Sequence, residues 1–412
     1  MAALSDASTR RNTSLILLLL TLATIVKVVW AANSIGTPDT VRFYKFGKEL
    51  VEKGPAEVYA GDARWNQTMS VTLLMQSLIL VTGGNGEAFL LWFRLPGILA
   101  DIVVVVEMLL LRRRLGLGWG WLALAAVSPI NLLVCGFHGN LDGLVAAGMF
   151  LAITGAVRGN PLLSGFWLGL ACHVKVAPVL LAPALAAFWL TRGGLIRFSV
   201  VFGAMGALLV GSGVAVAGMP FIKHVLGYGS LWAYWGIPEV LATLGLTNSE
   251  VPLDGFRDPV SGRIATALKV IIIGVACWLA WIGRLADGRG LMRTAATTLI
   301  VFFILTPGFG HQYMVWWFAI VLAAMPIWGA VLTVASTTLL VVYYSVWSNS
   351  PFPWRIVYPN GPLEGKLAFV SIGAWVVFTI AGGVMVVDAW RRSKKSAIVD
   401  DPRPIEAGDF TN

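Results

Sequence analysis

Residues 89–114 read FLLWFRLPGILADIVVVVEMLLLRRR, and this stretch decides the fold. Its apolar part, Phe89 to Leu111, is long enough to cross the roughly 30 Å of bilayer hydrocarbon as a helix, and it ends at three consecutive arginines. Similar runs recur along the chain. They are continuous rather than alternating, which excludes a transmembrane β-barrel. We therefore expect an all-α, polytopic bundle of transmembrane helices.

The composition agrees with a membrane protein. Of the 412 residues, 57% are hydrophobic and 12% are charged, whereas a soluble domain has about 25% charged residues. The net charge of +9 does not indicate a nucleic-acid partner, because the basic residues cluster in short connections, as cytoplasmic loops do. These clusters are Arg10-Arg11, Arg112–Arg114, Arg192–Arg197, Arg284–Arg293 and Arg391–Lys395. The three cysteines are isolated in apolar stretches, which is typical of packing residues.

The positive-inside rule predicts about 11–13 spans with a cytoplasmic amino terminus. The expected long spans are residues 13–32, 89–111, 117–135, 198–217, 264–282 and 294–305, with a fourth span that returns to Arg158 and a last span that ends at Arg391. Two short helices are expected within 162–190, and two more before Trp347. The first span is too long for a signal peptide and contains Lys27, which we place with Trp30 near the far interface. Lys175 is placed at the external turn of the two short helices, because a lysine at mid-membrane is costly.

Two long external segments follow from this topology. Residues 34–88 are expected to hold a surface helix at 41–53 and a partly embedded helix at 67–82. Residues 218–263 form the second segment and contain Trp232, Trp235, Glu239, Glu250, Asp254 and Asp258. The chain thus divides into a tail (1–12), a transmembrane module (13–217), the second loop (218–263), a second module (264–390) and a tail (391–412). Any chemistry is expected on the external face.

Asp39 is the first candidate for chemistry. The turn from Ser34 to Thr40 leaves it just outside the membrane, where partial loss of solvation is expected to raise its basicity and suit a general base. The alternative is that Asp39 only caps a helix beginning at Val41.

Further polar groups are expected on the same face. The corner His138-Gly139-Asn140-Leu141-Asp142 presents three of them, and its alternative role is a cap for the next span. Lys175 with His173 can pair with a lipid phosphate beside hydrocarbon, or snorkel to the interface. Arg94 has the same two interpretations. His311, Gln312 and Tyr313 follow a Pro-Gly turn and can contact a sugar or phosphate, or only stabilise their own loop.

The order of these features resembles the GT-C superfamily of membrane glycosyltransferases, mainly over residues 34–190 and again at 306–313. Within it, the chain is most similar to bacterial polyprenol-phosphate-mannose-dependent mannosyltransferases and the related eukaryotic GPI mannosyltransferase type. The residues that carry the resemblance are Asp39, Tyr44, Gly54, Tyr59, Arg94-Leu95-Pro96, Asp101, Ser128-Pro129, Gly139–Asp142, Gly169-Leu170 and Val174-Lys175. After Asn66, where relatives often have Tyr-Pro-Pro, this chain has Gln67-Thr68-Met69, a departure that bears on subfamily and acceptor.

The resemblance implies transfer of a hexose from a polyprenyl-phosphate-sugar donor to a lipid-linked or glycan acceptor, with inversion. Mannose is the expected hexose. Asp39 would be the catalytic base and Asp142 the acidic residue of the second loop. The expected substrate-binding residues are Tyr44, Arg94, His138, Asn140, Asp142, His173, Lys175, His311 and Gln312. No cofactor or metal is expected beyond the donor itself, although a divalent ion at Asp39 and Asp142 stays open.

We expect a multi-pass protein of a bacterial plasma membrane rather than the endoplasmic reticulum, with the site on the external or lumenal face. A transporter or flippase of lipid-linked sugars is the competing class, because it also has many spans and buried charge. It should often show internal repeats and mid-membrane polar residues. We find no clear repeat, and the charges fall near external ends. A non-catalytic membrane subunit is the third possibility.

Overall fold

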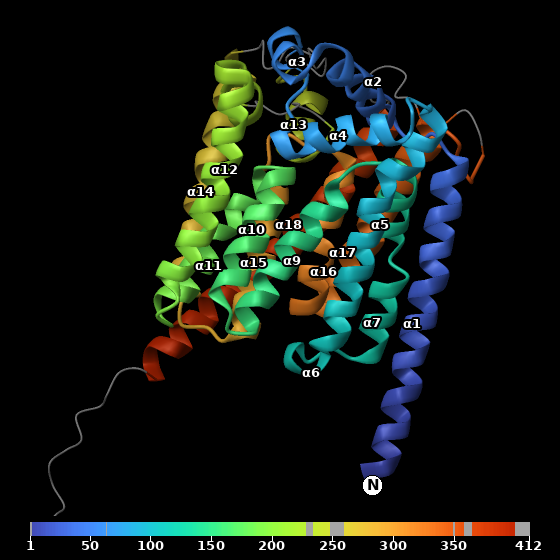
Figure 1. Cartoon of the computed structure of the whole chain (residues 1–412). Helices are drawn as coiled ribbons and strands as arrows, with labels where there is room; N and C mark the ends of the chain where they lie inside the picture. The colour runs from blue at the N-terminus through green and yellow to red at the C-terminus, as the bar shows by residue number, and fades with distance from the viewer. Residues whose placement is uncertain are drawn as a thin grey trace, which may run out of the picture.

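In the computed structural model, the chain is an all-α bundle of membrane-spanning helices, which confirms the predicted fold class (Figure 1). The structure describes residues 2–62, 64–227, 234–247, 259–348, 351–357 and 365–399. Within these ranges, eight helical segments are long and apolar enough to cross a bilayer. They are α1 (Ala2–Asn33), α5 (Gly86–Leu110), α7 with α8 and η1 (Trp119–Ala126, Pro129–Asn131, Leu132–His138), α12 with η3 (Leu195–Phe221, Ile222–Leu226), α14 (Pro259–Ile282), α15 (Gly288–Leu305), α17 (Pro326–Trp347) and α18 (Gly365–Val399).

Shorter apolar helices stand among these long ones. They are α9 (Asp142–Val157), α10 (Pro161–Val174), η2 with α11 (Ala177–Leu181, Ala182–Leu190), and η4 with α16 (His311–Met314, Val315–Ala324). Helices α9 and α16 are buried along almost their whole length, so their neighbours rather than lipid surround them. The expected dozen elements are present only when these short helices are included. The prediction that both helices before Trp347 are short is wrong for the second of them, because α17 has 22 residues.

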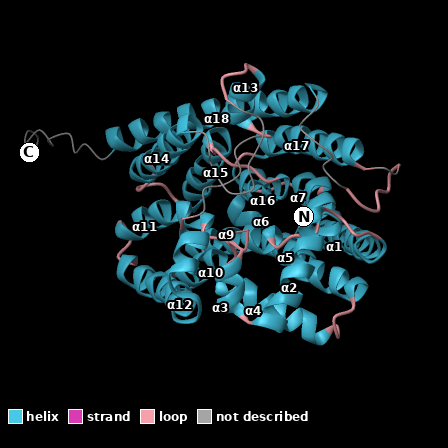
Figure 2. Cartoon of the chain, turned by 90° about the horizontal axis from the view of Figure 1, so that it is seen from above, coloured by secondary structure: helices cyan, strands magenta, loops and turns pink. Residues whose placement is uncertain are grey.

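Three helices lie across one end of the bundle instead of along it: α2 (Pro38–Lys53), α3 (Pro55–Gly61) and α4 (Met69–Val81) (Figures 1 and 2). The apolar side of α2, with Phe43, Phe46 and Leu50, packs with Met75 and Ile79 of α4 in one hydrophobic cluster. This layer contains both helices that the sequence predicts in residues 34–88. We call this end of the bundle the α2 end.

Helix α2 begins three residues earlier than predicted. Proline is favoured in the first turn because its φ is already helical and its missing N–H would be unpaired there anyway, so Pro38 starts the helix. Asp39 consequently lies in the first turn, and Thr37 is the N-cap residue. The interpretation of Asp39 as a simple cap is therefore wrong.

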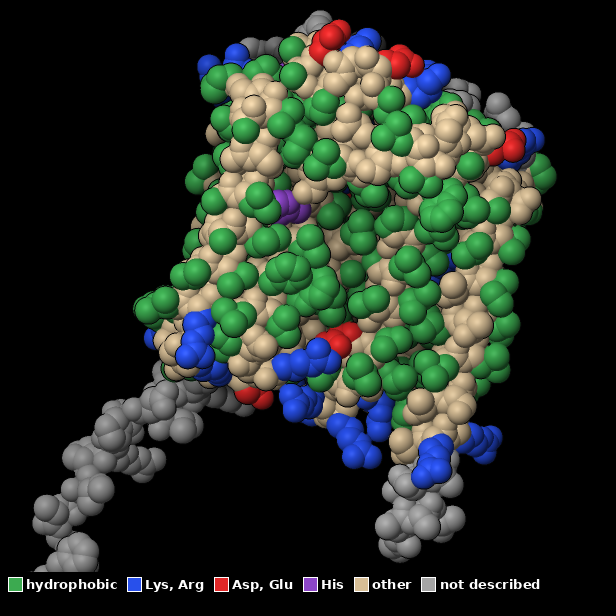
Figure 3. Space-filling view, viewed as in Figure 1, with side chains coloured by type: hydrophobic (Ala, Val, Ile, Leu, Met, Phe, Trp, Pro, Cys, Tyr) green, Lys and Arg blue, Asp and Glu red, His purple; other side chains and the backbone are tan. Residues whose placement is uncertain are grey.

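The opposite end carries the arginine clusters, and we call it the arginine end. Figure 3 shows Lys and Arg side chains gathered there, below a broad hydrophobic surface. The short helix α6 (Arg112–Leu115) lies at this end, as do the beginning of α1 and the end of α18 (Figure 1). Both ends of the described chain therefore lie on the side that the charge pattern assigns to the cytoplasm.

One ion pair is enclosed within the bundle. Lys27 of α1 and Asp101 of α5 form a contact in which both side chains are only 1% exposed, and Asn131 of α8 donates to the same carboxylate. Lys27 is therefore enclosed by protein, and its place near the far interface stays a prediction. Its amino group is paired instead of reaching water, which offsets the cost of burying it.

The second predicted loop is described in part. Trp232, Glu250, Asp254 and Asp258 lie outside the described residues. The short helix α13 (Gly236–Thr243) lies at the α2 end, on the half of the bundle that α2 to α4 leave uncovered (Figure 2). Trp235 before it is buried and donates to the carbonyl of Phe303, and Glu239 accepts from the backbone N–H of Tyr234. Trp235 thus anchors this loop to α15, whereas the bond of Glu239 lies within the loop.

Candidate active site

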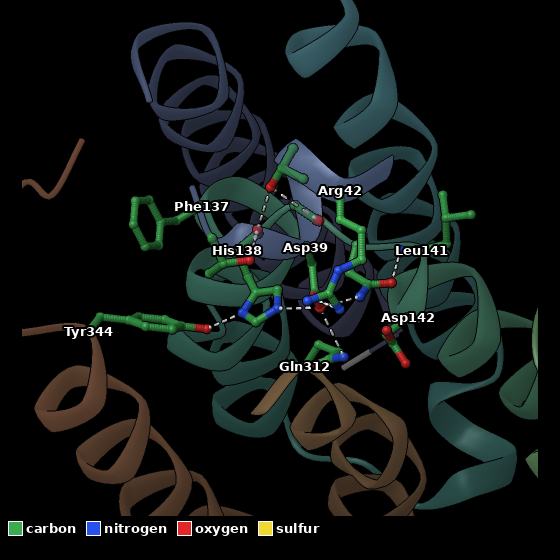
Figure 4. Close-up of polar contacts among 12 residues, drawn as sticks. Asp39, Arg42, Phe137, His138, Leu141, Asp142, Gln312 and Tyr344 are labelled. Carbon is green, nitrogen blue, oxygen red and sulfur yellow. Dashed lines mark hydrogen bonds and ion pairs between the residues drawn. The ribbon is translucent and has the colours of Figure 1, made fainter. Parts of the chain in front are cut away.

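Asp39 lies at the centre of a polar cluster at the α2 end (Figure 4). Its Oδ2 accepts from the side-chain amides of Asn140 at 3.2 Å and Gln312 at 3.3 Å, and the Nε2 of His138 lies 3.5 Å away. Its Oδ1 is 3.9 Å from the guanidinium of Arg42. The side chain is 29% exposed, and its hydrogen bonds fall on Oδ2, while Oδ1 has, among the described residues, only the longer contact with Arg42.

The corner that supplies His138 and Asn140 is fixed by its backbone. Residues 132–138 form the π-helix η1, a rare form that is frequent at functional sites, and Gly139 follows with a φ of +74°. A side chain at Gly139 would lie 2.7 Å from the Oγ1 of Thr40, so only glycine fits this close approach. The hydroxyls of Thr37 and Thr40 both donate to the carbonyl of His138 at 3.0 Å. These bonds join the start of α2 directly to the corner.

A second carboxylate lies on the side of Asp39 away from Tyr344 (Figure 4). Asp142, the first residue of α9, is fully buried, and both of its oxygens accept from the amino group of Lys175 at 2.9 and 3.0 Å. The indole N–H of Trp316 donates to Oδ1 at 2.7 Å. Asp142 therefore forms an ion pair with Lys175 and is not limited to capping α9.

Lys175 lies at the turn where the sequence places it. Helix α10 ends at Val174, Lys175 is extended, and η2 begins at Ala177. The ammonium group lies 4.3 Å from the ring centre of Tyr313, and its side chain is 22% exposed. A lysine cation on an aromatic face and beside a carboxylate is held in place, yet its open side can meet an anion.

The residues 311–313 connect the two halves of the cluster. They form the 3₁₀ helix η4, in which three residues make one turn and consecutive side chains point in three directions. The ring of His311 packs 4.1 Å from that of Tyr343, Gln312 donates to Asp39, and Tyr313 stacks on Trp316 beside Lys175. This loop therefore contributes to the cluster in addition to stabilising itself.

The charge around Asp39 keeps it ionised. Burial is the largest single influence and raises the pKa of this carboxyl, but the hydrogen bond from His138 lowers it. Electrostatic interactions with His138, Arg42 and Lys175 lower it further, so that the pKa of Asp39 falls from 3.8 to about 2. The expectation of raised basicity is therefore wrong, because the cationic neighbours outweigh the loss of solvation.

Arg94 is structural in this arrangement. Its side chain is fully buried and donates to four backbone carbonyls, at distances from 2.6 to 3.1 Å. These belong to Ala31, Ser34, Ile35 and Phe137. Arg94 thus joins the end of α1, the first loop and the 137–139 corner, and its terminal nitrogens are engaged by the protein instead of facing a substrate.

Two other predicted residues lie outside the cluster. The ring nitrogens of His173 are paired with the hydroxyl of Ser70 at 2.8 Å and the carbonyl of Met205 at 2.9 Å, so this side chain joins α10 to α4 and α12. The hydroxyl of Tyr44 donates to the carbonyl of Gly84 at 2.6 Å and holds α2 over the turn before α5. Neither side chain contacts Asp39 or Lys175.

The sequence reasoning missed Trp316, Arg42 and Tyr344 as members of the cluster. Arg42 follows Asp39 by three residues on one helix, a spacing that brings side chains together. That signal was available in the sequence. Trp316 and Tyr344 are more than 170 residues away from the groups they bind, and no local pattern identifies them.

No group of three His, Cys, Asp or Glu side chains in the described part of the chain is placed to hold a metal ion. The pair Asp39 and Asp142 offers two carboxylates, and both oxygens of the second are engaged by Lys175.

No protein-family model matches the chain, and no curated protein was found to match its sequence.

Proposed function

We propose that this protein is a glycosyltransferase that moves a hexose from a polyprenyl-phosphate-sugar donor to a lipid-linked or glycan acceptor, with mannose as the preferred hexose. The observation that carries the proposal is the single cluster at the α2 end, where a carboxylate open on one oxygen and a lysine open on one side lie together, opposite the arginine end. The resemblance to GT-C enzymes in residues 34–190 supports the same role.

Asp39 acts as the base in this scheme. Its Oδ1 takes the proton from an acceptor hydroxyl, the hydroxyl oxygen forms a bond to the anomeric carbon, and the bond from that carbon to the phosphate oxygen breaks. A carboxylate with a pKa of about 2 is a weak base, so the proton moves late, after the attacking oxygen has become acidic through bond formation. The amide N–H groups of Asn140 and Gln312 on Oδ2, with Nε2 of His138 at 3.5 Å, keep the carboxylate oriented for that step.

Lys175 stabilises the leaving group. The electron pair of the broken bond goes to the phosphate, which becomes a phosphate monoester, and the ammonium group of Lys175 faces the charge that develops there. Asp142 and Trp316 hold that ammonium in position. Figure 3 shows a recess lined with hydrophobic side chains between α5 and α10, below α4, which can receive an isoprenoid chain.

The α2 end is the external or lumenal side in this proposal, in a bacterial plasma membrane by preference. An impermeant thiol reagent should then label Asp62→Cys in intact cells and should label Arg113→Cys only after the membrane is opened. Labelling of both positions from the same side would contradict the topology.

The transfer assay uses the purified full chain with radiolabelled polyprenyl-phosphate-mannose and a lipid acceptor. We expect Asp39→Asn to lose transfer and Asp62→Asn to keep it, because Asp62 pairs with Arg64 near the surface of the same end. Equal transfer by both variants would remove Asp39 from its role. Movement of the labelled donor across a liposome membrane without any transfer product would favour the transporter.

A further inference from the structure

The ring of His138 lies between a phenol and a carboxylate (Figure 4). Its Nδ1 is 2.7 Å from the hydroxyl oxygen of Tyr344 on α17, and its Nε2 is 3.5 Å from the Oδ2 of Asp39. The two nitrogens therefore face different partners, and the position of the ring proton decides what Asp39 receives.

Tyr344 is held rigidly in this contact. Its side chain is 1% exposed, and its ring packs against those of Phe137 at 5.2 Å and Trp354 at 5.5 Å. Trp354 belongs to a segment that is bonded to the first loop through Ile35 and Gly36. A buried phenol needs an acceptor for its O–H, and the hydrogen-bond partner of Tyr344 within the described residues is the Nδ1 of His138.

We propose that Tyr344 is a positioning residue that fixes the tautomer of His138. The phenol donates to Nδ1, so the neutral imidazole carries its proton on Nε2 and directs that N–H at Oδ2 of Asp39. The role of this N–H in catalysis rests on the proposed function, whereas the tautomer itself does not.

The consequence is a division between the two oxygens of Asp39. Oδ2 receives N–H groups from His138, Asn140 and Gln312, while Oδ1 faces Arg42 at 3.9 Å and is left to accept the proton of a hydroxyl. With the opposite tautomer, the lone pair of Nε2 would face the lone pairs of Oδ2, and the carboxylate would be pushed out of this orientation.

The position of the ring proton can be measured directly. We would label the histidines of the full chain with ¹⁵N, record solid-state NMR spectra in lipid bilayers at pH 8, and assign the signal with His138→Gln. We expect an unprotonated Nδ1 and a protonated Nε2. A proton on Nδ1, alone or together with one on Nε2, would overturn the proposal.

A pair of variants separates the phenol from the carboxylate. In Asp39→Ala the phenol alone remains, and we expect the proton to stay on Nε2. In Asp39→Ala with Tyr344→Phe neither partner remains, and we expect a mixture of tautomers. Tyr59→Phe in the same background is the control, because it removes another buried phenol hydroxyl, whose hydrogen bonds go to Gln67 and Thr72 and not to His138. An unchanged tautomer in the double variant would overturn the proposal; if that variant does not fold, the spectra of the native chain and Asp39→Ala decide.

The transfer assay supplies the second measurement. We expect Tyr344→Phe to lower kcat about tenfold, or about 1.4 kcal/mol, with little change in the KM of either substrate, and Tyr59→Phe to leave kcat per folded molecule unchanged. An unchanged kcat in Tyr344→Phe would contradict the positioning role. Absence of transfer by the native chain would instead remove the proposed function and leave the tautomer result standing.

Discussion

Two lysine–aspartate pairs lie within the bundle, and they differ in what surrounds the lysine. Lys27 and Asp101 are both enclosed, with each side chain 1% exposed. Asp142 is equally buried, but the side chain of its partner Lys175 is 22% exposed and lies at a helix turn. The same chemical pair thus occurs once closed on all sides and once open on one.

The comparison teaches what an ion pair can do at each place. A closed pair has already lost its hydration, so its value lies in holding α1 to α5 and α8, and removal of one partner leaves a bare charge. The open pair keeps a side on which Lys175 can bind a further anion without giving up Asp142. Structural and chemical roles are therefore distinguished by the exposure of the cation and not by the residue types.

The largest effect should come from opening the closed pair. Lys27→Met leaves Asp101 charged and unpaired, and we expect the free energy of unfolding to fall by about 3–5 kcal/mol. Reversible unfolding in mixed micelles would measure it. Adding Asp101→Leu should restore most of the loss, and transfer per folded molecule should stay within about twofold of native. A Lys27→Met variant that is as stable as the native chain but has lost transfer would show that the enclosed pair is not structural, contrary to the comparison.

The open pair should behave in the opposite way. Lys175→Met removes the cation that faces the leaving phosphate in the proposed mechanism, and we expect kcat to fall by about 10²–10³-fold, measured in the transfer assay on protein that remains folded. Lys48→Met is the matched control, since Lys48 is an exposed lysine of α2 at the same end of the bundle. Loss of folding without loss of kcat in the folded fraction would show that Lys175 is structural.

The aspartates sharpen the contrast further. Asp101→Asn leaves the buried charge of Lys27 without a counterion or water, whereas Asp142→Asn leaves Lys175, whose ammonium group can turn toward solvent. We expect Asp101→Asn to be the more destabilising of the two by roughly 2 kcal/mol. Thermal unfolding of the two variants side by side checks this, and equal losses would mean that the exposure of Lys175 has no energetic consequence.

The smallest effect concerns pH. The pKa of Asp39 is lowered from 3.8 to about 2 on folding, so its stabilising contribution is complete above pH 4 and is lost as the pH falls from 3.8 toward 2. We expect no change from Asp39 between pH 4 and 8, and a loss of roughly 2 kcal/mol below that range. Acid unfolding of the native chain and Asp39→Asn would reveal it; a titration of Asp39 near pH 6 would contradict the assigned charge environment.

Much of the fold follows from the sequence because the bilayer restricts the choices. Runs of apolar residues must be helices, and the arginine clusters orient them. The cost of a lysine at mid-membrane correctly placed a turn at Lys175. The same rule does not identify Asp101, 74 residues further along the chain, as the buried partner of Lys27.

The candidate site follows from the sequence in part. Local turns identified Asp39, His138, Asn140 and Gln312, which the fold does bring together. A sequence pattern says which groups are polar and near an interface, but not which atoms they face. Arg94 is engaged by carbonyls for that reason, although its charge made it a candidate for phosphate.

The tight helix η4 carries a constraint on how this protein can vary. Because each residue of η4 advances the side-chain direction by a third of a turn, inserting or deleting one residue at its start, before Gln312, would rotate Gln312 away from Asp39 and Tyr313 away from Lys175 at once. A substitution in this loop removes one contact, whereas a change of length disconnects both. Related sequences should therefore keep the length of this segment even where they differ in its residues.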